Sequence, residues 1–392
     1  MLGTLKLRWT KAARCLAMAV VLYAAPVAVW ASDVRLGPIG SGNVAGRLQP
    51  LNVPLRESSS ATAEAPASDR WQSPYHDVDR LHGNPLTDPL DFSPAESELF
   101  ADAAEGHLRR LSLLESGLLA SDVDDLGTIA QAREQFGAAR AELLNVVTAA
   151  GVPANAPLQS DSNILRRVQL IHQILHQRLL HGGYNANATN LVTTLQTGIY
   201  NCASATLLFV ALADEFDVPA QAIELPGHVR AIVDCRGQQY EIEVTCPVWS
   251  EAIRRCEDSG TLNPSLAQRE RENRRGVSPL GLVAMIYYNR GVDAFNERRF
   301  VEALAANRRA LLLDPENAIA RANLLAAVNN WALALSDAGY FADAEKLLAA
   351  GQRFDPNHLA FVHNAAHVMK MWSQMQSAAG AAQKTSPAMP SL

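Results

Sequence analysis

The residues that decide the fold are 198–209, which read Gly-Ile-Tyr-Asn-Cys-Ala-Ser-Ala-Thr-Leu-Leu-Phe. From Cys202 to Phe216 the chain has no Gly or Pro, and apolar residues occupy almost every face. That pattern is typical of a helix buried in a core. Asn201 is a good N-cap residue, and the Thr-Gly pair before it predicts a turn. Cys202 therefore falls in the first helical turn, where the partial positive charge of the helix favours a thiolate.

A β-hairpin is predicted downstream of this helix. Residues 228–235 and 240–244 alternate between two faces, which is the period of strands, and Arg236-Gly237 can form the turn. With this turn Arg230 faces Glu243, and Glu243 lies diagonal to His228 on the same face. A slip of one residue would place the histidine and the acid on opposite faces, so the expected site depends on this register.

Cys202, His228 and Glu243 are the parts of a thiol triad. A thiol is a poor nucleophile at neutral pH, and it becomes a good one when a helix N-terminus and an imidazole stabilise its thiolate. A carboxylate on the other imidazole nitrogen fixes the tautomer and the ring orientation. The chain has no Gly-x-Ser-x-Gly, phosphate-loop or dinucleotide motif, so the sequence offers no other nucleophile family.

Residues 196–247 resemble the transglutaminase-like superfamily, a branch of the papain-like thiol fold. The family pattern is a Gly before an Asn- or Asp-preceded Cys at a helix start, then a His on a strand and an acid on the next strand. Here these are Gly198, Cys202, His228 and Glu243. The family acid is most often Asp; the Glu variant is associated with bacterial members that carry helical repeats. The resemblance implies Cys202 as nucleophile, His228 as general base and acid, and Glu243 as the residue that orients the histidine.

The fold class implied is α+β, with a core of one helix and an antiparallel sheet. Gln196 is a candidate oxyanion donor, because papain-like enzymes use a Gln upstream of the nucleophile; the alternative is a solvated loop residue. The backbone N–H of Cys202 is the preferred oxyanion donor. The resemblance does not fix the reaction, since the superfamily includes acyl transferases, peptidases, amidases and inactive members.

Two functions remain open from the sequence. The first is an exported thiol enzyme that cleaves or transfers an amide or peptide acyl group, with hydrolysis favoured because no residue marks an amine site. The second is a non-catalytic scaffold that keeps the fold and holds a partner. A peptide or protein is the expected substrate, and no cofactor is implied.

The N-terminus has the features of a secretory signal peptide. Four basic residues precede an apolar run from Leu16 to Trp30, and cleavage is expected after Ala31. We therefore expect an exported, periplasmic or secreted protein with no stable membrane span in the mature chain. Cleavage would change the net charge from −6 to −10. Such an acidic protein is a poor general binder of nucleic acid.

Four cysteines remain after cleavage, and their spacing matches no zinc pattern. In an oxidising compartment Cys246 and Cys256 are a possible disulfide pair; the alternative is that these two and Cys235 are all thiols. His172 and His176 share one helix face, but no third ligand is evident. A structural or solvated role is therefore preferred, and no metal site is predicted.

The C-terminal part shows a repeat. Small residues and prolines stand at tetratricopeptide spacing, in a first copy with Gly291, Ala303, Ala310 and Pro315 and a second with Ala332, Ala344, Gly351 and Pro356. A last helix over about 358–375 is expected to cap the array. Such helices bind a peptide or protein partner or only brace the core, and the sequence favours neither.

Composition and capping signals complete the organisation. Ser93 and Glu96 form a capping box that predicts a helix from Pro94, and helices are expected over 94–119, 123–150 and 163–181. The expected divisions are a signal peptide (1–31), a disordered linker (32–92), a helical region (93–158), a transglutaminase-like core (159–260), a connector (261–279), tetratricopeptide-like repeats (280–376) and a disordered tail (377–392).

Overall fold

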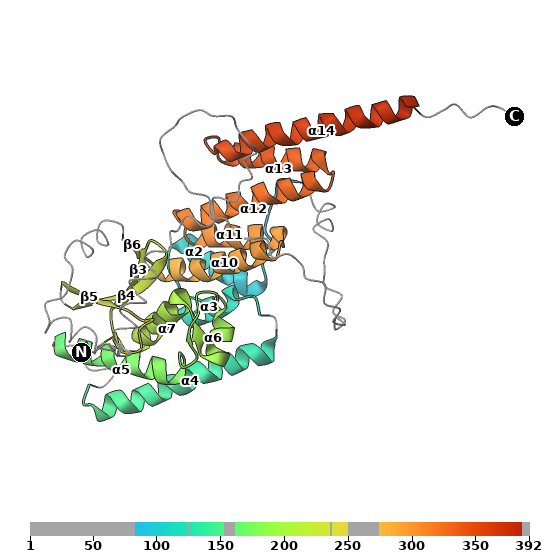
Figure 1. Cartoon of the computed structure of the whole chain (residues 1–392). Helices are drawn as coiled ribbons and strands as arrows, with labels where there is room; N and C mark the ends of the chain where they lie inside the picture. Colours follow the sequence, from blue (N-terminus) through green and yellow to red (C-terminus); the bar gives the residue numbers. More distant parts are fainter. Residues whose placement is uncertain (1–82, 124, 153–160, 236, 250–273, 386–392) are drawn as a thin grey trace, which may run out of the picture. The chain divides into compact units, whose positions relative to one another are not determined.

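The computed structural model describes residues 83–123, 125–152, 161–235, 237–249 and 274–385 (Figure 1). They fall into two compact units of mixed α+β architecture overall. Of the described residues, unit 1 contains those within 91–290 and 309–317, and unit 2 contains 83–90, 291–308 and 318–385. The expected signal peptide lies outside the described residues.

Unit 1 begins with the predicted capping box. The Ser93 hydroxyl accepts from the Glu96 N–H at 3.1 Å, and the Glu96 carboxylate accepts from the Ser93 N–H at the same distance. Together with Pro94 at the first helical position, this box starts α2 (Pro94–Glu105) as expected. The next long helices also match their predictions, and they are α4 (Leu126–Ala149) and α5 (Asp161–Arg178).

The single helix predicted over 94–119 is wrong. Gly106 ends α2 in the left-handed conformation, with φ of 82°. The buried carboxylate of Asp102 accepts from the backbone N–H groups of residues 109 and 110 at 2.8 Å each, which holds the chain in a turn. A separate helix, α3 (Leu113–Ala120), then begins. A side chain that satisfies backbone donors in a turn competes with helix continuation.

The sheet of unit 1 has four antiparallel strands in the order β5-β4-β3-β6 (Figure 1). These strands are β3 (Ala220–Leu225), β4 (His228–Cys235), β5 (Gln238–Ile242) and β6 (Arg275–Val277). In the β4–β5 hairpin Ala231 pairs with Ile242 and Cys235 with Gln238, which confirms the predicted register. The His228 and Glu243 side chains are therefore on one face, because a strand alternates its side chains.

One helix covers the sheet and carries the cysteine. It is α7 (Cys202–Glu215), and residues Ala203 to Ala213 are all buried, as the all-round apolar pattern predicted. The helix packs on β3 and β4, where the Thr206 hydroxyl donates to the Val229 carbonyl at 3.4 Å. Its first turn is thereby held above the start of β4.

A short parallel pair leads into α7. Its strands are β1 (Gly183–Tyr184) and β2 (Ile199–Tyr200), separated by α6 (Leu191–Thr197). Gly182 is needed beside this pair, since an added Cβ would lie 2.6 Å from the Thr197 carbonyl oxygen. The sequence did not predict this pairing, which positions the turn just before the cysteine.

Two expected boundaries need correction. The predicted connector 261–279 contains β6, which pairs with β3, and also the first residue of the next helix. The predicted linker 32–92 ends too late, because Leu86 is 5% exposed and the Phe92 ring lies 4.4 Å from that of Phe100. β6 is held by backbone pairing with β3, and the end of the expected linker is held by side-chain burial.

The C-terminal part of the described chain is helical, as expected. Its helices are α10 (Pro279–Asn296), α11 (Phe300–Leu313), α12 (Ala318–Asp337), α13 (Phe341–Phe354) and α14 (Leu359–Thr385). Within unit 2, α12, α13 and α14 pack side by side (Figure 1). Small residues allow close contacts: a Cβ at Gly351 would lie 2.3 Å from the Phe361 ring. Membership of the tetratricopeptide family stays a prediction.

The last helix is longer than expected. The prediction ended it near residue 375, whereas α14 continues to Thr385, so the tail expected to be disordered from 377 is helical over its first part. Residues 386–392 lie outside the described chain. Among the described residues, no helix has both the length and the apolar character needed to cross a membrane.

Candidate active site

Cys202 is the first residue of α7. The Asn201 side chain accepts from the Ser204 N–H at 2.9 Å, and the Ser204 hydroxyl accepts from the Asn201 N–H at 3.1 Å. Both capping residues are buried, so the start of the helix is tightly fixed. Cys202 itself is partly exposed and not in a disulfide. The sulfur therefore belongs to a partly exposed residue at a capped helix N-terminus.

His228 and Glu243 meet as the hairpin register predicted. The His228 Nε2 donates to Glu243 Oε2 at 2.9 Å and lies 3.1 Å from Oε1. Only 14% of the His228 side chain and 17% of the Glu243 side chain are exposed, so water screens the pair weakly. Because Glu243 takes Nε2, Nδ1 is the ring nitrogen left to interact with Cys202, which contributes to the raised pKa of His228.

Two further residues complete the surroundings of Glu243. The Arg230 Nε donates to Oε2 at 2.8 Å, and the Thr245 hydroxyl donates to Oε1 at 2.5 Å. Burial raises the pKa of Glu243, but the hydrogen bond and charge of His228, the charge of Arg230 and the bond from Thr245 outweigh it and lower the pKa to about 2. The acid is therefore a carboxylate throughout the neutral range. The sequence placed Arg230 opposite Glu243 but assigned no role to Thr245.

The electrostatics of His228 favour its charged form. Burial lowers its pKa, yet hydrogen bonds to Cys202 and Glu243, together with their charges, raise the pKa to about 9. An imidazolium that persists at neutral pH beside a sulfur is the partner a thiolate requires. The arrangement can therefore hold a charged nucleophile and a proton donor side by side.

Tyr184 lies near the triad and was missed by sequence reasoning. Its ring is edge-on to that of Tyr200, with centroids 6.1 Å apart. Burial raises its pKa, and the charges of Cys202 and Glu243 raise it further. Its hydroxyl is therefore protonated and able to donate a hydrogen bond. Tyr184 is placed near the triad because its strand pairs with the strand before the cysteine. No local pattern in the sequence indicates this pairing.

The structure does not bring Gln196 to the triad. Its side chain is exposed on α6, and its amide Nε2 donates to Gln131 Oε1 of α4 at 3.5 Å. This exposure favours the alternative of a solvated residue, and the role of Gln196 as an oxyanion donor stays a prediction. The side of a short helix that faces solvent depends on tertiary packing, which a single upstream Gln does not indicate.

His172 and His176 are close to the acid rather than in solvent. Their rings are 4.6 Å apart on α5, and His176 Nε2 donates to the Val244 carbonyl at 2.8 Å. Within the described ranges, no three His, Cys, Asp or Glu side chains gather as metal ligands do. The pair thus contacts the backbone beside Glu243.

The other cysteines leave the disulfide hypothesis as it was. Cys235 is buried in β4, and Cys246 is partly exposed just after Glu243. Cys256 lies outside the described residues, so the expected Cys246–Cys256 pairing stays a prediction. Neither Cys235 nor Cys246 is part of the triad.

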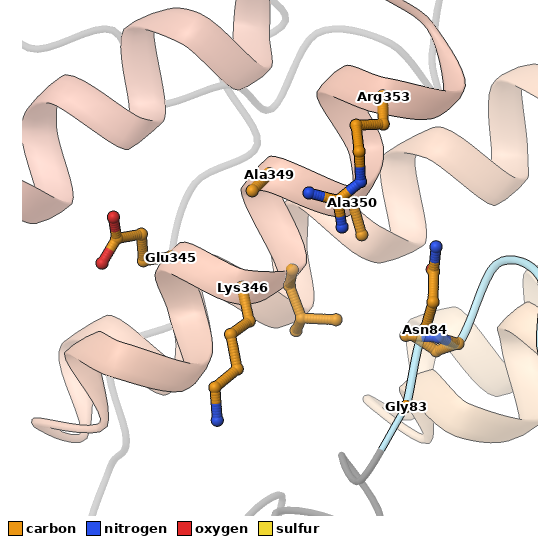
Figure 2. A pocket seen from close by; sticks show the side chains of 9 residues that line it. Gly83, Asn84, Glu345, Lys346, Ala349, Ala350 and Arg353 are labelled. Atoms are coloured by element: carbon orange, nitrogen blue, oxygen red, sulfur yellow. The ribbon is translucent and has the colours of Figure 1, made fainter.

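A hollow of about 280 Å³ lies in unit 2, away from any triad residue. Figure 2 shows Lys346 and Arg353 on α13 and Asn84 on the segment that faces this helix. Lys346 is paired with Asp343 at 2.9 Å. Nothing in its lining resembles the paired acid, base and nucleophile of unit 1.

Comparisons with protein-family models, with curated proteins and with solved structures gave no match. The chemistry of the site is therefore argued from its own side chains.

Proposed function

We propose that the protein is an exported thiol enzyme of transglutaminase-like type, which cleaves or transfers an amide or peptide acyl group. One observation carries the proposal: Glu243 is hydrogen-bonded to Nε2 of His228, and the same histidine interacts electrostatically with Cys202, the first residue of a capped helix. A purely structural protein has no need for this order of acid, base and thiol. Export follows from the signal-peptide features of residues 1–31.

In this mechanism the Cys202 thiolate attacks the carbonyl carbon of an amide, and a C–S bond forms while negative charge moves to the oxygen. Backbone N–H groups of the first helical turn have no partner within the helix, and that of Cys202 is the donor proposed for this oxygen. The C–N bond then breaks, and the His228 imidazolium gives its proton to the leaving amine. An acyl-enzyme remains.

The second half of the reaction releases the acyl group. His228, now neutral, accepts a proton from water or from an acceptor amine as that nucleophile attacks the thioester carbonyl. The C–S bond breaks and the thiolate re-forms. Hydrolysis is preferred over transfer, because no described residue marks an amine site. Glu243 stays ionised throughout and holds the imidazole in one orientation.

The C-terminal helices are proposed to bind a peptide or protein partner or to brace the fold. The α12–α13 and α13–α14 contacts give unit 2 a packed helical face of the kind that tetratricopeptide-like arrays use. Truncation before α12 separates the roles: loss of binding with an intact triad indicates a partner surface, and loss of folding indicates bracing.

The test is the rate of alkylation of Cys202 by iodoacetamide from pH 5 to 9, followed by intact mass and peptide mapping. An isolated thiol is only about 0.3% thiolate at pH 6, because its pKa is near 8.5. We expect fast alkylation of Cys202 at pH 6 and a rate about tenfold or more lower in His228→Ala. Cys202→Ala supplies the background from the other cysteines.

Equal and slow rates at pH 6 in the wild type and in His228→Ala would contradict the proposal. That result would favour the alternative, a non-catalytic periplasmic scaffold that keeps the fold and binds a partner. Far-ultraviolet circular dichroism of both proteins confirms that the comparison is made between folded chains.

A further inference from the structure

Two histidines of α5 contact the segment that carries the triad acid. His172 and His176 are four residues apart, and only 3% of His172 is exposed. His176 donates through Nε2 to the Val244 carbonyl at 2.8 Å. His172 is hydrogen-bonded to the backbone of Glu243 and of Cys246. Both imidazoles thus contact the main chain at the acid and just after it.

Aromatic rings close the same region. The Trp249 ring lies 5.7 Å from that of His172, and the Tyr200 ring lies 5.8 Å from that of His176. The Tyr200 hydroxyl donates to the Thr245 carbonyl at 3.1 Å. The backbone that follows β5 is therefore anchored at successive residues, although it is past the last ladder pair of the sheet.

The two histidines are neutral. Burial lowers the pKa of His172 to about 3, with a further contribution from His176, and burial lowers that of His176 to about 4. His172 Nε2 and His176 Nδ1 are buried and have no hydrogen-bond partner among the described residues. Each ring thus uses one N–H to hold a carbonyl and adds no charge beside Glu243. The carboxylate keeps its ionic contacts for His228 and Arg230.

We propose that His172 and His176 are positioning residues of the thiol site, which fix the main chain of residues 243–246 so that the Glu243 carboxylate faces His228. This inference rests on the proposed function. A small rotation of the residue 243 backbone would move the carboxylate away from Nε2, since Glu243 reaches the histidine across a diagonal of the hairpin. The active orientation then depends on contacts from α5 and not on the sheet alone.

The experiment uses a matched pair at position 176. His176→Gln places an amide nitrogen near the position of Nε2 and keeps a donor for the Val244 carbonyl. His176→Asn is shorter, so its amide nitrogen is near the position of Nδ1 and cannot reach this carbonyl. Both are polar and similar in size, which separates the hydrogen bond from burial. Each is made in the wild type and in Glu243→Gln, and the rate of Cys202 alkylation at pH 6 is measured.

We expect His176→Gln to react within about twofold of the wild type and His176→Asn to lose about fivefold or more in the wild-type background. In the Glu243→Gln background the two should react alike, because the histidine acts through the acid; such non-additivity is the sign of coupling. Urea denaturation of all four proteins gives the accompanying change in the free energy of unfolding.

Three outcomes overturn the inference. In the first, the Gln and Asn variants react equally in the wild-type background. In the second, the difference between them persists unchanged without the acid. In the third, Cys202 reacts normally in a variant that is strongly destabilised. After any of these outcomes the proposed function is still supported if Cys202 is alkylated more slowly in His228→Ala than in the wild type. Loss of that His228 effect, in contrast, overturns the proposed function itself.

Discussion

Two glutamates of unit 1, one in the antiparallel sheet and one just after its last strand, are each bound by an arginine, yet their surroundings differ. Glu243 follows β5, and His228, Arg230 and Thr245 together occupy both of its oxygens. Glu224 is in β3, where Oε2 accepts from Arg275 at 2.8 Å while Oε1 is buried with no hydrogen-bond partner among the described residues. One carboxylate is fully satisfied and the other is not.

The two glutamates differ in whether the charge of their basic partner can change with pH. Arg275 stands directly opposite Glu224 in the sheet and also binds Asp314 at 2.8 Å, and this hydrogen bond is the largest cause of its raised pKa. The Arg275 guanidinium keeps its charge at any pH. The cluster of Glu224, Arg275 and Asp314 therefore joins β6 and the end of α11 to β3. Glu243 instead contacts a histidine, a group whose charge can change with pH, and the pKa of His228 is raised to about 9. Glu224 thus stabilises the structure through an ion pair, whereas Glu243 orients a histidine.

Removing each carboxylate charge gives the largest contrast. We expect Glu243→Gln to lower the rate of Cys202 alkylation at pH 6 by about 10–100-fold, because the imidazolium loses its counter-charge and its orientation. Glu224→Gln should change the rate by less than about twofold. Intact-mass kinetics measure both. Equal losses in the two variants would show that the effect is a general one of the sheet.

The pH dependence of stability is the next effect. The pKa of His228 is raised from 6.5 to about 9, so its stabilising contribution is complete below pH 6.5 and is lost as the pH rises through 9. The pKa of Glu243 is lowered from 4.5 to about 2, so its contribution is present above pH 4.5 and is lost as the pH falls through 2. We expect the free energy of unfolding to fall by on the order of 2 kcal/mol between pH 6.5 and 9.

Urea denaturation at several pH values measures this slope. In His228→Ala the decrease between pH 6.5 and 9 should be largely absent, whereas Glu224→Gln should retain it. A wild-type stability that is flat or rises over this interval would contradict the raised pKa of His228.

Removing Arg275 from its ion pairs is expected to have a smaller effect, and to change the free energy of unfolding alone. Arg275→Met leaves Glu224 and Asp314 without their shared cation, and we expect a loss of about 1–3 kcal/mol in the free energy of unfolding. The exposed pair Arg140–Glu215, at 2.8 Å, is the control, and its removal by Arg140→Met should cost less than about 1 kcal/mol. Cys202 alkylation at pH 6 should be unchanged in both, and a large drop in Arg275→Met would show that the two regions are coupled.

The smallest effect is expected at Gln196. Because its amide contacts Gln131 and its side chain is exposed, Gln196→Ala should alter the Cys202 alkylation rate by less than about twofold. Gln131→Ala is the matched control. A drop comparable to that of Glu243→Gln would support the interpretation of Gln196 as an oxyanion donor.

The predictable part of the site comes from local patterns. Asn201 before an apolar run predicted the helix start at Cys202, and strict alternation on both sides of a two-residue turn predicted the β4–β5 register. These features depend on neighbours within a few residues. The placement of Glu243 beside His228 followed from the hairpin register, whereas the placement of Cys202 beside them was implied only by the family resemblance.

The parts that sequence reasoning missed depend on distant contacts. β6 joins the sheet more than forty residues after β3, through three residues that carry no strand pattern of their own. Asp102 breaks the first helix by capturing N–H groups that are seven and eight residues away. His172 and His176 fit a solvated helix face equally well until the segment after β5 is placed on them.

The most direct test of the triad is the titration of the His228 imidazole by NMR, assigned by its loss in His228→Ala. The account predicts a pKa of about 9 in the wild type and a clearly lower value in Cys202→Ala, because the hydrogen bond and charge of the cysteine are removed. A wild-type His228 that titrates at 6.5 or below, or that is unaffected by Cys202→Ala, would contradict the coupling of nucleophile, base and acid.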